Sequence, residues 1–183
     1  MSSSDNKTSH SELSGLVKLL RQSLEMTEQI SISLTKELAF IKEYLILEKN
    51  KLGEDFRLNL DIDERVNTDL VFLPAMIIQI PVENAIKHAL RAKEGEKLLQ
   101  IAISAVDNCT KISIQDNGAG YHPGATHSPN STGTGLKVLY QTIQLLNTKN
   151  TNKISYAIEN INEPNTSGTR VNIIIPLQYS FDL

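Results

Sequence analysis

The spacing of apolar residues changes from a helical to a strand period near residue 56, and this change constrains the fold more than any other feature of the chain. Before that point, apolar residues recur at intervals of three and four, which is the spacing of an amphipathic helix. They form two groups: Leu13, Leu16, Val17, Leu20 and Leu24, then Leu38, Ile41, Leu45 and Leu52. From Phe56 to Ile62, apolar and polar residues alternate, as in a strand with one buried face. The sequence therefore predicts a helical segment followed by a domain that contains a sheet.

Capping residues mark the ends of the predicted helices. Ser33 suits the N-cap of the second helix and Gly53 suits its end, with the two helices joined near residues 27–33. In a third helix we expect Pro74 in the first turn, where proline is favoured, and we expect Pro81 to introduce a kink. The core-facing residues of this helix would be Ile77, Ile78, Ala85, Ile86 and Ala89.

The rest of the chain alternates strands with one further helix. Period-two patterns indicate strands over residues 99–105, 112–114, 154–158 and 171–175, and a helical pattern begins at Thr134. The first two of these strands form a hairpin around Asp107, and crossovers are few. We therefore predict an α+β fold: a two-layer α/β sandwich with a mixed, mainly antiparallel sheet covered by helices on one face, preceded by the helical segment.

These patterns divide the chain into three parts. Residues 1–11 have neither the basic start nor the apolar centre of a signal peptide and are interpreted as a disordered or vector-derived tail. Residues 12–53 form the helical segment, and residues 54–183 form the domain that contains the sheet.

Composition excludes several classes of protein. A net charge of −3 is too acidic for a general nucleic-acid binder. A single cysteine, Cys109, allows no intrachain disulfide and no zinc knuckle. The longest apolar stretch, residues 71–82, is far shorter than the roughly 20 residues that span a bilayer. We therefore expect no nucleic acid, no membrane contact by this part of the protein, and a cytoplasmic location.

An acidic residue followed by glycines ends the predicted hairpin, in the run Asp116-Asn117-Gly118-Ala119-Gly120. These residue types are common in plain turns. In a nucleotide site, the carboxylate of Asp116 would accept a hydrogen bond from the exocyclic amine of adenine, a bond of about 1.5–3 kcal/mol. Gly118 and Gly120 would allow the backbone to approach the ligand closely.

A long polar loop follows and leads into a helix. Residues 117–135 contain almost no apolar side chain, so we expect a mobile loop that acts as a nucleotide lid. It ends in Gly133-Thr134-Gly135-Leu136, which either simply starts a helix or presents free backbone amides to phosphate groups.

Three polar residues of the predicted third helix share one face. Asn84, Lys87 and His88 lie three and four residues apart. They are either the solvent-facing side of the helix or part of a nucleotide site. In a nucleotide site, the amide oxygen of Asn84 suits Mg²⁺ and Lys87 would neutralise phosphate charge. A fourth motif, Gly168-Thr169, could be a hairpin turn.

The order and spacing of these four motifs resemble the N, G1, G2 and G3 boxes of the superfamily that unites gyrase, heat-shock chaperone, histidine kinase and mismatch-repair ATPases. Within that superfamily, three segments resemble LytS/YehU-type bacterial sensor histidine kinases: residues 19–24, residues 37–45 and residues 74–88. The resemblance runs from about Leu13 to Pro176. It implies the GHKL, or Bergerat, ATP-binding fold.

The resemblance also implies roles for individual residues. Asn84, Lys87 and His88 would be catalytic, and Asn84 would bind Mg²⁺. The nucleotide-binding residues would be Asn84, Lys87, His88, Asp116, Gly118, Gly120, Gly133, Thr134, Gly135, Leu136 and Thr169. The cofactors implied are ATP and Mg²⁺.

By the same resemblance, the protein would be an ATP-dependent protein histidine kinase of a two-component system. Such kinases are homodimers that phosphorylate a histidine and pass the phosphate to a response regulator. The family's His-Phe-x-x-Asn phosphoacceptor motif is absent from this sequence. We therefore expect the acceptor histidine upstream of this chain, in a full-length protein anchored in the bacterial inner membrane, and no autophosphorylation by this chain alone.

Some residues depart from the family pattern and support other functions. Lys137 replaces the asparagine that often follows Gly-Leu, and the family's later Arg-Leu pair is replaced around Gln141-Thr142-Ile143. Both changes favour a degenerate kinase acting as a nucleotide-binding or docking module. A hydrolase like gyrase would carry a carboxylate one turn before Asn84. That position is Ile80, which disfavours hydrolysis as the main activity.

Overall fold

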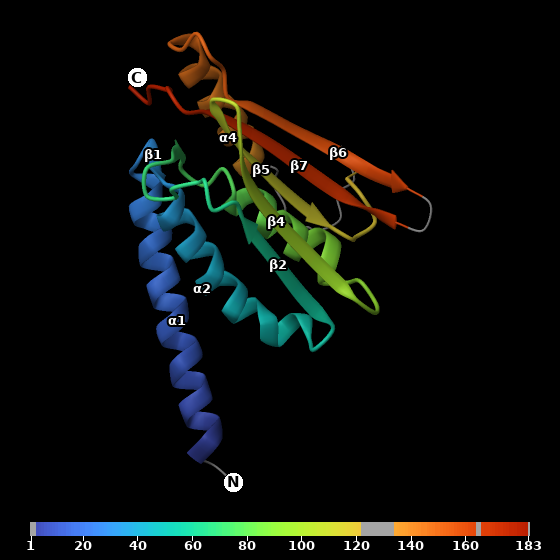
Figure 1. The fold of residues 1–183 in the computed structure, drawn as a ribbon. Helices are drawn as coiled ribbons and strands as arrows, with labels where there is room; N and C mark the ends of the chain where they lie inside the picture. Colours follow the sequence, from blue (N-terminus) through green and yellow to red (C-terminus); the bar gives the residue numbers. More distant parts are fainter. Residues whose placement is uncertain (1–2, 122–133, 164–165, 183) are drawn as a thin grey trace.

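The computed structural model describes residues 3–121, 134–163 and 166–182. Two helices lead into the sheet domain, α1 (Ser3–Thr27) and α2 (Leu34–Leu52), and the N-terminal half of α1 extends beyond the rest of the molecule (Figure 1). Because α1 begins at Ser3, residues 3–11 are helical where the sequence predicted a tail without structure. In the described residues, no helix is both long and apolar enough to span a bilayer.

The predicted ends of α2 are confirmed. The Ser33 hydroxyl accepts a hydrogen bond from the Lys36 N–H over 3.4 Å. At the other end, Gly53 has a φ of 85°, which side chains disfavour, and its N–H donates to the Lys49 carbonyl over 3.1 Å.

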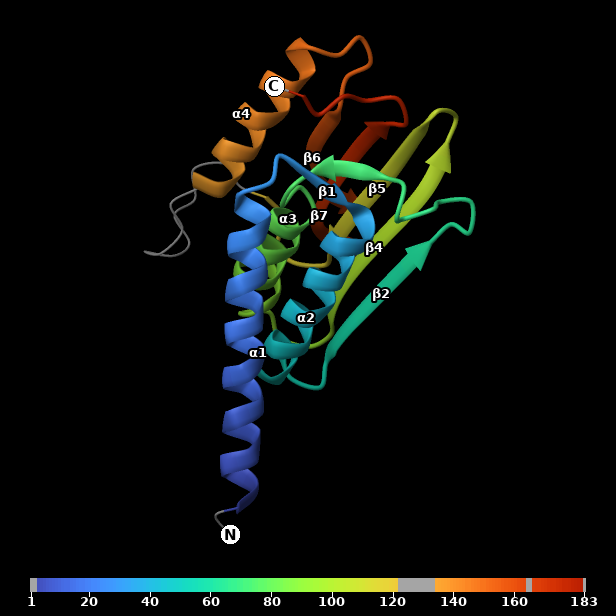
Figure 2. The same ribbon diagram turned by 90° about the vertical axis from the view of Figure 1, so that its left-hand side faces the viewer.

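The main sheet has five strands in the order β2-β4-β5-β7-β6. Their bounds are β2 (Phe56–Ile62), β4 (Lys97–Val106), β5 (Cys109–Asp116), β6 (Ser155–Glu163) and β7 (Thr166–Pro176). Strands β2 and β4 pair in parallel and all other neighbours pair antiparallel. The helices lie on one face of this sheet (Figure 2), so the predicted mixed, mainly antiparallel α+β sandwich is confirmed.

Alternate residues of the central strands make the core between the sheet and the helices. They are Leu99, Ile101 and Ile103 of β4, Ile112 and Ile114 of β5, and Val171, Ile173 and Ile175 of β7, all buried. Asp116 continues this alternation beyond Ile112 and Ile114, so its side chain also lies on the helix-covered face.

The prediction for Pro74 is wrong. Pro74 ends a short strand, β3 (Phe72–Pro74), which pairs antiparallel with β1 (Ser31–Ser33) and places Pro74 opposite Ser31. The third helix, α3 (Gln79–Asn84), starts later and runs directly into a π-helical turn, η1 (Ala85–Leu90).

Pro81 therefore lies in the first turn of α3 and does not interrupt a longer helix, contrary to the prediction. A missing N–H is tolerated there because the first turn of a helix has no acceptors within the helix. The irregular part of this helix lies further along, where the Arg91 N–H donates to the carbonyl of Ile86, five residues earlier.

The last helix, α4 (Thr134–Thr148), begins at the residue that the sequence predicted. It buries Leu139, Ile143 and Leu146. Most of the predicted lid, residues 122–133, lies outside the described residues, and Gly133 is among them. Of the predicted loop, residues 117–121 are neither helix nor strand, whereas Thr134 and Gly135 belong to α4.

Candidate functional site

Asp116 is a buried carboxyl group at the end of β5, with 4% of the residue exposed. Its Oδ1 atom accepts hydrogen bonds from the N–H of Gly118 over 2.8 Å and from the N–H of Thr169 over 3.3 Å. Burial raises the pKa of Asp116, and the hydrogen bonds from Gly118 and Thr169 oppose that rise. The strand end therefore presents an oriented acidic group on the helix-covered face of the sheet.

Gly168 and Thr169 lie inside a strand rather than at a hairpin turn. In β7, Gly168 pairs with Ile161 and Thr169 pairs with Asn160. A Cβ atom on Gly168 would lie 2.0 Å from the carbonyl oxygen of Asp116. The fourth sequence motif thus contacts the acidic residue directly.

Gly118 and Gly120 are required by packing within the chain itself. A Cβ atom on Gly118 would lie 2.5 Å from the Cβ atom of Ala89, so β5 ends directly against η1. Gly120 has a φ of 93°, and a Cβ atom there would lie 2.9 Å from Oδ1 of Asn160. The close approach of these two glycines to a ligand stays a prediction.

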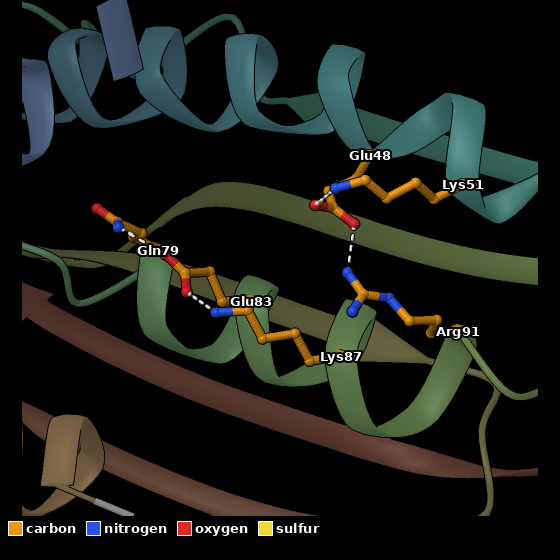
Figure 3. A network of polar contacts seen from close by, with 6 residues as sticks. All are labelled: Glu48, Lys51, Gln79, Glu83, Lys87 and Arg91. Atoms are coloured by element: carbon orange, nitrogen blue, oxygen red, sulfur yellow. Dashed lines mark hydrogen bonds and ion pairs between the residues drawn. The ribbon is translucent and has the colours of Figure 1, made fainter. Parts of the chain in front are cut away.

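Asn84, Lys87 and His88 are all exposed, whereas Ala85 and Ile86 between them are buried. The predicted shared polar face is therefore present. Lys87 has a carboxylate partner, because its Nζ lies 2.5 Å from Oε2 of Glu83. The other oxygen of Glu83 accepts a hydrogen bond from the Gln79 side chain over 2.7 Å, so the three side chains form a ladder along the helix (Figure 3).

The motifs gather around this helix. Ala89 of η1 touches Gly118, which brings the Asp116 end of β5 against the turn that carries Lys87 and His88. On the other side, a Cβ atom on Gly135 would lie 3.9 Å from the Cδ1 atom of Ile80, so the start of α4 lies beside α3. Leu136 is half-buried in α4, and the side chain of Thr134 lies outside the described residues.

A cavity of about 220 Å³ lies elsewhere, at the opposite end of β5. Its lining includes Thr110, Ile175, Tyr179 and Phe181, and it contains none of the predicted site residues. It also lacks the charged groups that would bind phosphate. We therefore assign the candidate site to the Asp116 end of the sheet, where the acidic group and the polar helix meet.

The side chains present suit Mg²⁺ held mainly by a substrate. Among the described residues, no group of three or more His, Cys, Asp or Glu side chains forms a metal cage. Mg²⁺ commonly takes only one or two protein oxygens and fills its remaining positions with phosphate and water. The exposed amide of Asn84 meets that requirement.

Glu37 was not singled out from the sequence as a residue that contacts the candidate site. It is fully buried on α2, and its Oε1 accepts hydrogen bonds from the N–H groups of Ile78, over 2.6 Å, and Gln79, over 2.9 Å. Burial raises the pKa of Glu37 to about 8. Its place in the apolar stripe of α2, between Leu34 and Ile41 at helical spacing, was the signal that could have revealed it.

Comparison with known proteins places this geometry in a family. The model described as histidine kinase-, DNA gyrase B-, and HSP90-like ATPase matches residues 72–179, which contain every motif of the candidate site. The chain belongs to this ATPase family. A second model, described as histidine kinase, matches residues 1–56, which cover α1 and α2.

Named relatives narrow the resemblance to sensor histidine kinases. The sensor protein LytS of Staphylococcus epidermidis is 30% identical over 182 residues, covering 96% of this chain and 30% of the relative. The sensor histidine kinase YpdA of Escherichia coli is 33% identical over 108 residues, covering 59% of this chain and 19% of the relative. The predicted LytS-type resemblance is confirmed, and the chain spans less than a third of the length of these relatives.

A solved structure supports the fold. The histidine kinase domain of the Erythrobacter litoralis blue-light activated histidine kinase matches with a TM-score of 0.57 and 19% identity, covering 91% of this chain and 75% of that one. At this identity the match establishes the arrangement of helices and strands only.

Proposed function

We propose that this chain is the ATP-binding catalytic part of a sensor histidine kinase, which transfers the γ-phosphoryl group of ATP to a histidine upstream of residue 1. The observation that carries the proposal is the buried carboxyl of Asp116, held by Gly118 and Thr169 at the end of β5 beside the turn that carries Lys87. From that strand end, a buried acceptor of hydrogen bonds can distinguish adenine, which offers an amine, from guanine, which offers a carbonyl.

The polar face of α3 and η1 supplies the other functional groups. Asn84 would contribute one oxygen ligand to Mg²⁺, while Lys87 and His88 would lie toward the phosphates and the sugar. When bound, the metal would neutralise phosphate charge, which is most of what phosphoryl transfer requires from the protein. Gly133, Thr134, Gly135 and Leu136 at the start of α4 would contact the phosphates through backbone amides.

The pairing of Lys87 with Glu83 bears on this assignment. The Lys87 side chain is 45% exposed, so it can turn from Glu83 toward a phosphate without disturbing the packing of the core. A phosphate would have to compete with the Glu83 carboxylate for the ammonium group. We therefore expect Glu83 to hold Lys87 in place before the nucleotide arrives.

Hydrolysis is disfavoured as the main activity. The position that would carry the water-activating carboxylate is Ile80, which faces the start of α4 near Gly135. An isoleucine cannot act as a general base. Transfer to a protein side chain fits these residues better than transfer to water.

Residues 12–53 would be the last part of the dimerisation and phosphoacceptor region. Among the side chains of α1 that the structure describes, Leu16, Val17, Leu20 and Leu24 are exposed apolar ones. More than half of each of these residues is exposed, so we expect a second copy to cover them in a homodimer. The phosphate would pass to a response regulator, and the full-length protein would be anchored in the bacterial inner membrane.

Thermal unfolding with nucleotide tests the proposal. A nonhydrolysable ATP analogue with Mg²⁺ at millimolar concentration should raise the melting temperature, because binding to the folded state alone stabilises it. The same concentration of the GTP analogue should raise it less. An unchanged melting temperature with the ATP analogue would refute nucleotide binding.

Phosphotransfer requires the longer protein that includes the upstream histidine. In that protein, labelled phosphate from ATP should appear on the histidine, and Asn84→Asp should abolish the labelling. A protein that binds the ATP analogue but never becomes labelled is instead a nucleotide-binding docking module.

A further inference from the structure

Helix α2 contacts both ends of the helix that carries Asn84 and Lys87, and it does so through the buried carboxyl groups of two glutamates. At the first end, Glu37 accepts the N–H groups of Ile78 and Gln79. Ile78 is the N-cap residue of α3, and in the described structure its own side chain makes no capping bond. Glu37 therefore supplies, from another helix, the acceptor that the first turn of α3 needs.

At the second end, Glu48 holds the residue that follows η1. Its Oε2 lies 2.6 Å from a guanidinium nitrogen of Arg91, and its Oε1 lies 3.0 Å from Nζ of Lys51 (Figure 3). The Glu48 side chain is only 9% exposed, whereas the Arg91 side chain is 45% exposed, so the carboxylate end of this ion pair is shielded from water and the guanidinium end is not. Although burial opposes ionisation, the hydrogen bonds from Lys51 and Arg91 lower the pKa of Glu48.

Between these two anchors lie the exposed residues Asn84 and Lys87. Contacts at both ends restrain rotation and sliding of this helix on α2 more than a contact at one end would. We propose that Glu37 and Glu48 are positioning residues of the nucleotide site, which tie the helix bearing Asn84 and Lys87 to α2. This inference rests on the proposed function.

The energetics favour positioning over stability as their role. Within the described part of the chain, the buried Oε2 atom of Glu37 has no hydrogen-bond partner. Burying such a group is unfavourable, and an apolar side chain of similar volume would avoid that penalty. The apolar residues Ile78, Ile86 and Leu90 are themselves fully buried in the core. The two glutamates fix the orientation of the helix, because Glu37 accepts hydrogen bonds from particular N–H groups and Glu48 pairs with one guanidinium group.

The two anchors also connect the nucleotide site to α1. Helix α1 packs on α2 where Gly15 meets Leu47, and Lys18 pairs with Glu43 over 2.6 Å. A displacement of α1 that moves α2 would therefore move both ends of the helix bearing Asn84. Because coupling of binding sites is reciprocal, nucleotide binding should in turn restrain α2.

Calorimetric titration with a nonhydrolysable ATP analogue and Mg²⁺ tests the inference on folded protein. Glu37→Met removes the acceptor at similar volume and should weaken binding about fivefold or more, in the usual range for such coupling. Glu37→Gln keeps an acceptor oxygen and should bind nearly as tightly as the unmutated chain. Glu43→Met makes the same substitution at a position of α2 whose carboxylate pairs with Lys18 of α1, and it serves as the matched control, with unchanged affinity.

A double-mutant cycle tests the second anchor. Glu48→Gln and Arg91→Gln should each weaken binding, and the double variant should bind no worse than the weaker single variant, because both remove one interaction. If Glu37→Met proves unable to fold, this cycle decides the question. Equal affinity in Glu37→Met, Glu48→Gln and the unmutated chain would overturn the inference and leave the proposed function intact.

Hydrogen exchange without nucleotide separates the two hypotheses. Faster exchange of the amides of residues 78–84 in Glu37→Met than in Glu37→Gln is expected whether or not the chain binds ATP. Failure of the unmutated chain to bind the analogue would refute the proposed function, and the role in positioning a nucleotide site with it. Unchanged exchange in Glu37→Met would refute the anchor itself.

Discussion

Gly168 lies against the backbone of Asp116 so closely that a Cβ atom on Gly168 would be 2.0 Å from the Asp116 carbonyl oxygen. This contact brings the next residue, Thr169, to the position where its N–H meets the Asp116 carboxylate. The glycine therefore sets the distance between β7 and the acidic end of β5.

We predict that Gly168→Ala lowers the free energy of unfolding by about 1–3 kcal/mol, because the added methyl group must push two strands apart. Denaturant unfolding measures this change. Gly95→Asn is the matched control: Gly95 has a φ of 71°, which asparagine tolerates, and a Cβ atom there meets nothing within 4 Å. Equal stability of Gly168→Ala and the unmutated chain would mean that the strand end adapts freely.

Asp116→Asn should separate folding from recognition. The asparagine oxygen can still accept the N–H groups of Gly118 and Thr169, so the melting temperature should change little. The amide nitrogen of asparagine would face the adenine amine in place of an acceptor. We expect affinity for the ATP analogue to fall by about 1.5–3 kcal/mol. Asp107→Asn, at the other end of the same hairpin, should bind normally, and tight binding by Asp116→Asn would remove the assigned adenine contact.

The buried carboxyl of Glu37 should make stability depend on pH. Its pKa is raised by burial from 4.5 in the unfolded chain to about 8 in the folded protein. Between these values the folded state keeps a proton that the unfolded state has lost. The contribution of the protonated Glu37 carboxyl to the free energy of unfolding is therefore fully present below pH 4.5. It declines as the pH rises toward 8 and is lost above pH 8.

Glu37→Gln cannot titrate and should flatten this decline. We expect the difference in free energy of unfolding between Glu37→Gln and the unmutated chain to change by up to about 1.4 kcal/mol per pH unit. This is the contribution of one proton. Denaturant unfolding at several values between pH 5 and pH 8 measures it. Glu43→Gln, at an exposed ion pair on the same helix, should keep the slope of the unmutated chain. Parallel slopes for Glu37→Gln and the unmutated chain would contradict the raised pKa.

Local patterns in the sequence determined most of the elements. The helical stripe of α2, its caps Ser33 and Gly53, and the alternation along β4 and β5 all depend on neighbouring residues, so the sequence predicted them. Pro74 was misplaced because its strand is three residues long and pairs with another of the same length, β1, far away in the chain. No local period exists over so few residues.

Only part of the candidate site could be predicted, because some of its contacts join residues far apart in the sequence. Asp116 and the helix bearing Asn84 were recognisable by residue type and order. The physical need for Gly118 was not, because its close neighbour Ala89 comes from another element. Glu37 and Glu48 fall in the apolar stripe of α2, and only the packed structure shows that they meet Ile78 and Arg91.

Helix α1 leads to the last prediction. Among its described side chains, Leu19 and Met26 are buried and face the molecule, whereas Leu20 and Leu24 are 63% and 60% exposed on another side. Burying one leucine stabilises an interface by about 1.5–3 kcal/mol, so a second copy of α1 would gain substantially from covering this stripe. Leu20→Glu with Leu24→Glu would place two carboxylates on each side of that interface, where they would repel one another.

Sedimentation velocity over a range of concentrations should show a dimer for the unmutated chain and a monomer for this double variant. At concentrations where both proteins are monomers, their melting temperatures should be similar. Ser14→Glu adds a negative charge at an exposed position of the same helix outside the apolar stripe and should leave the dimer intact. A double variant that sediments like the unmutated chain would show that the exposed leucines do not hold two copies together. If both proteins are dimers, the dimer contact lies elsewhere in the protein, and if both are monomers, the apolar face of α1 does not join two copies of this chain.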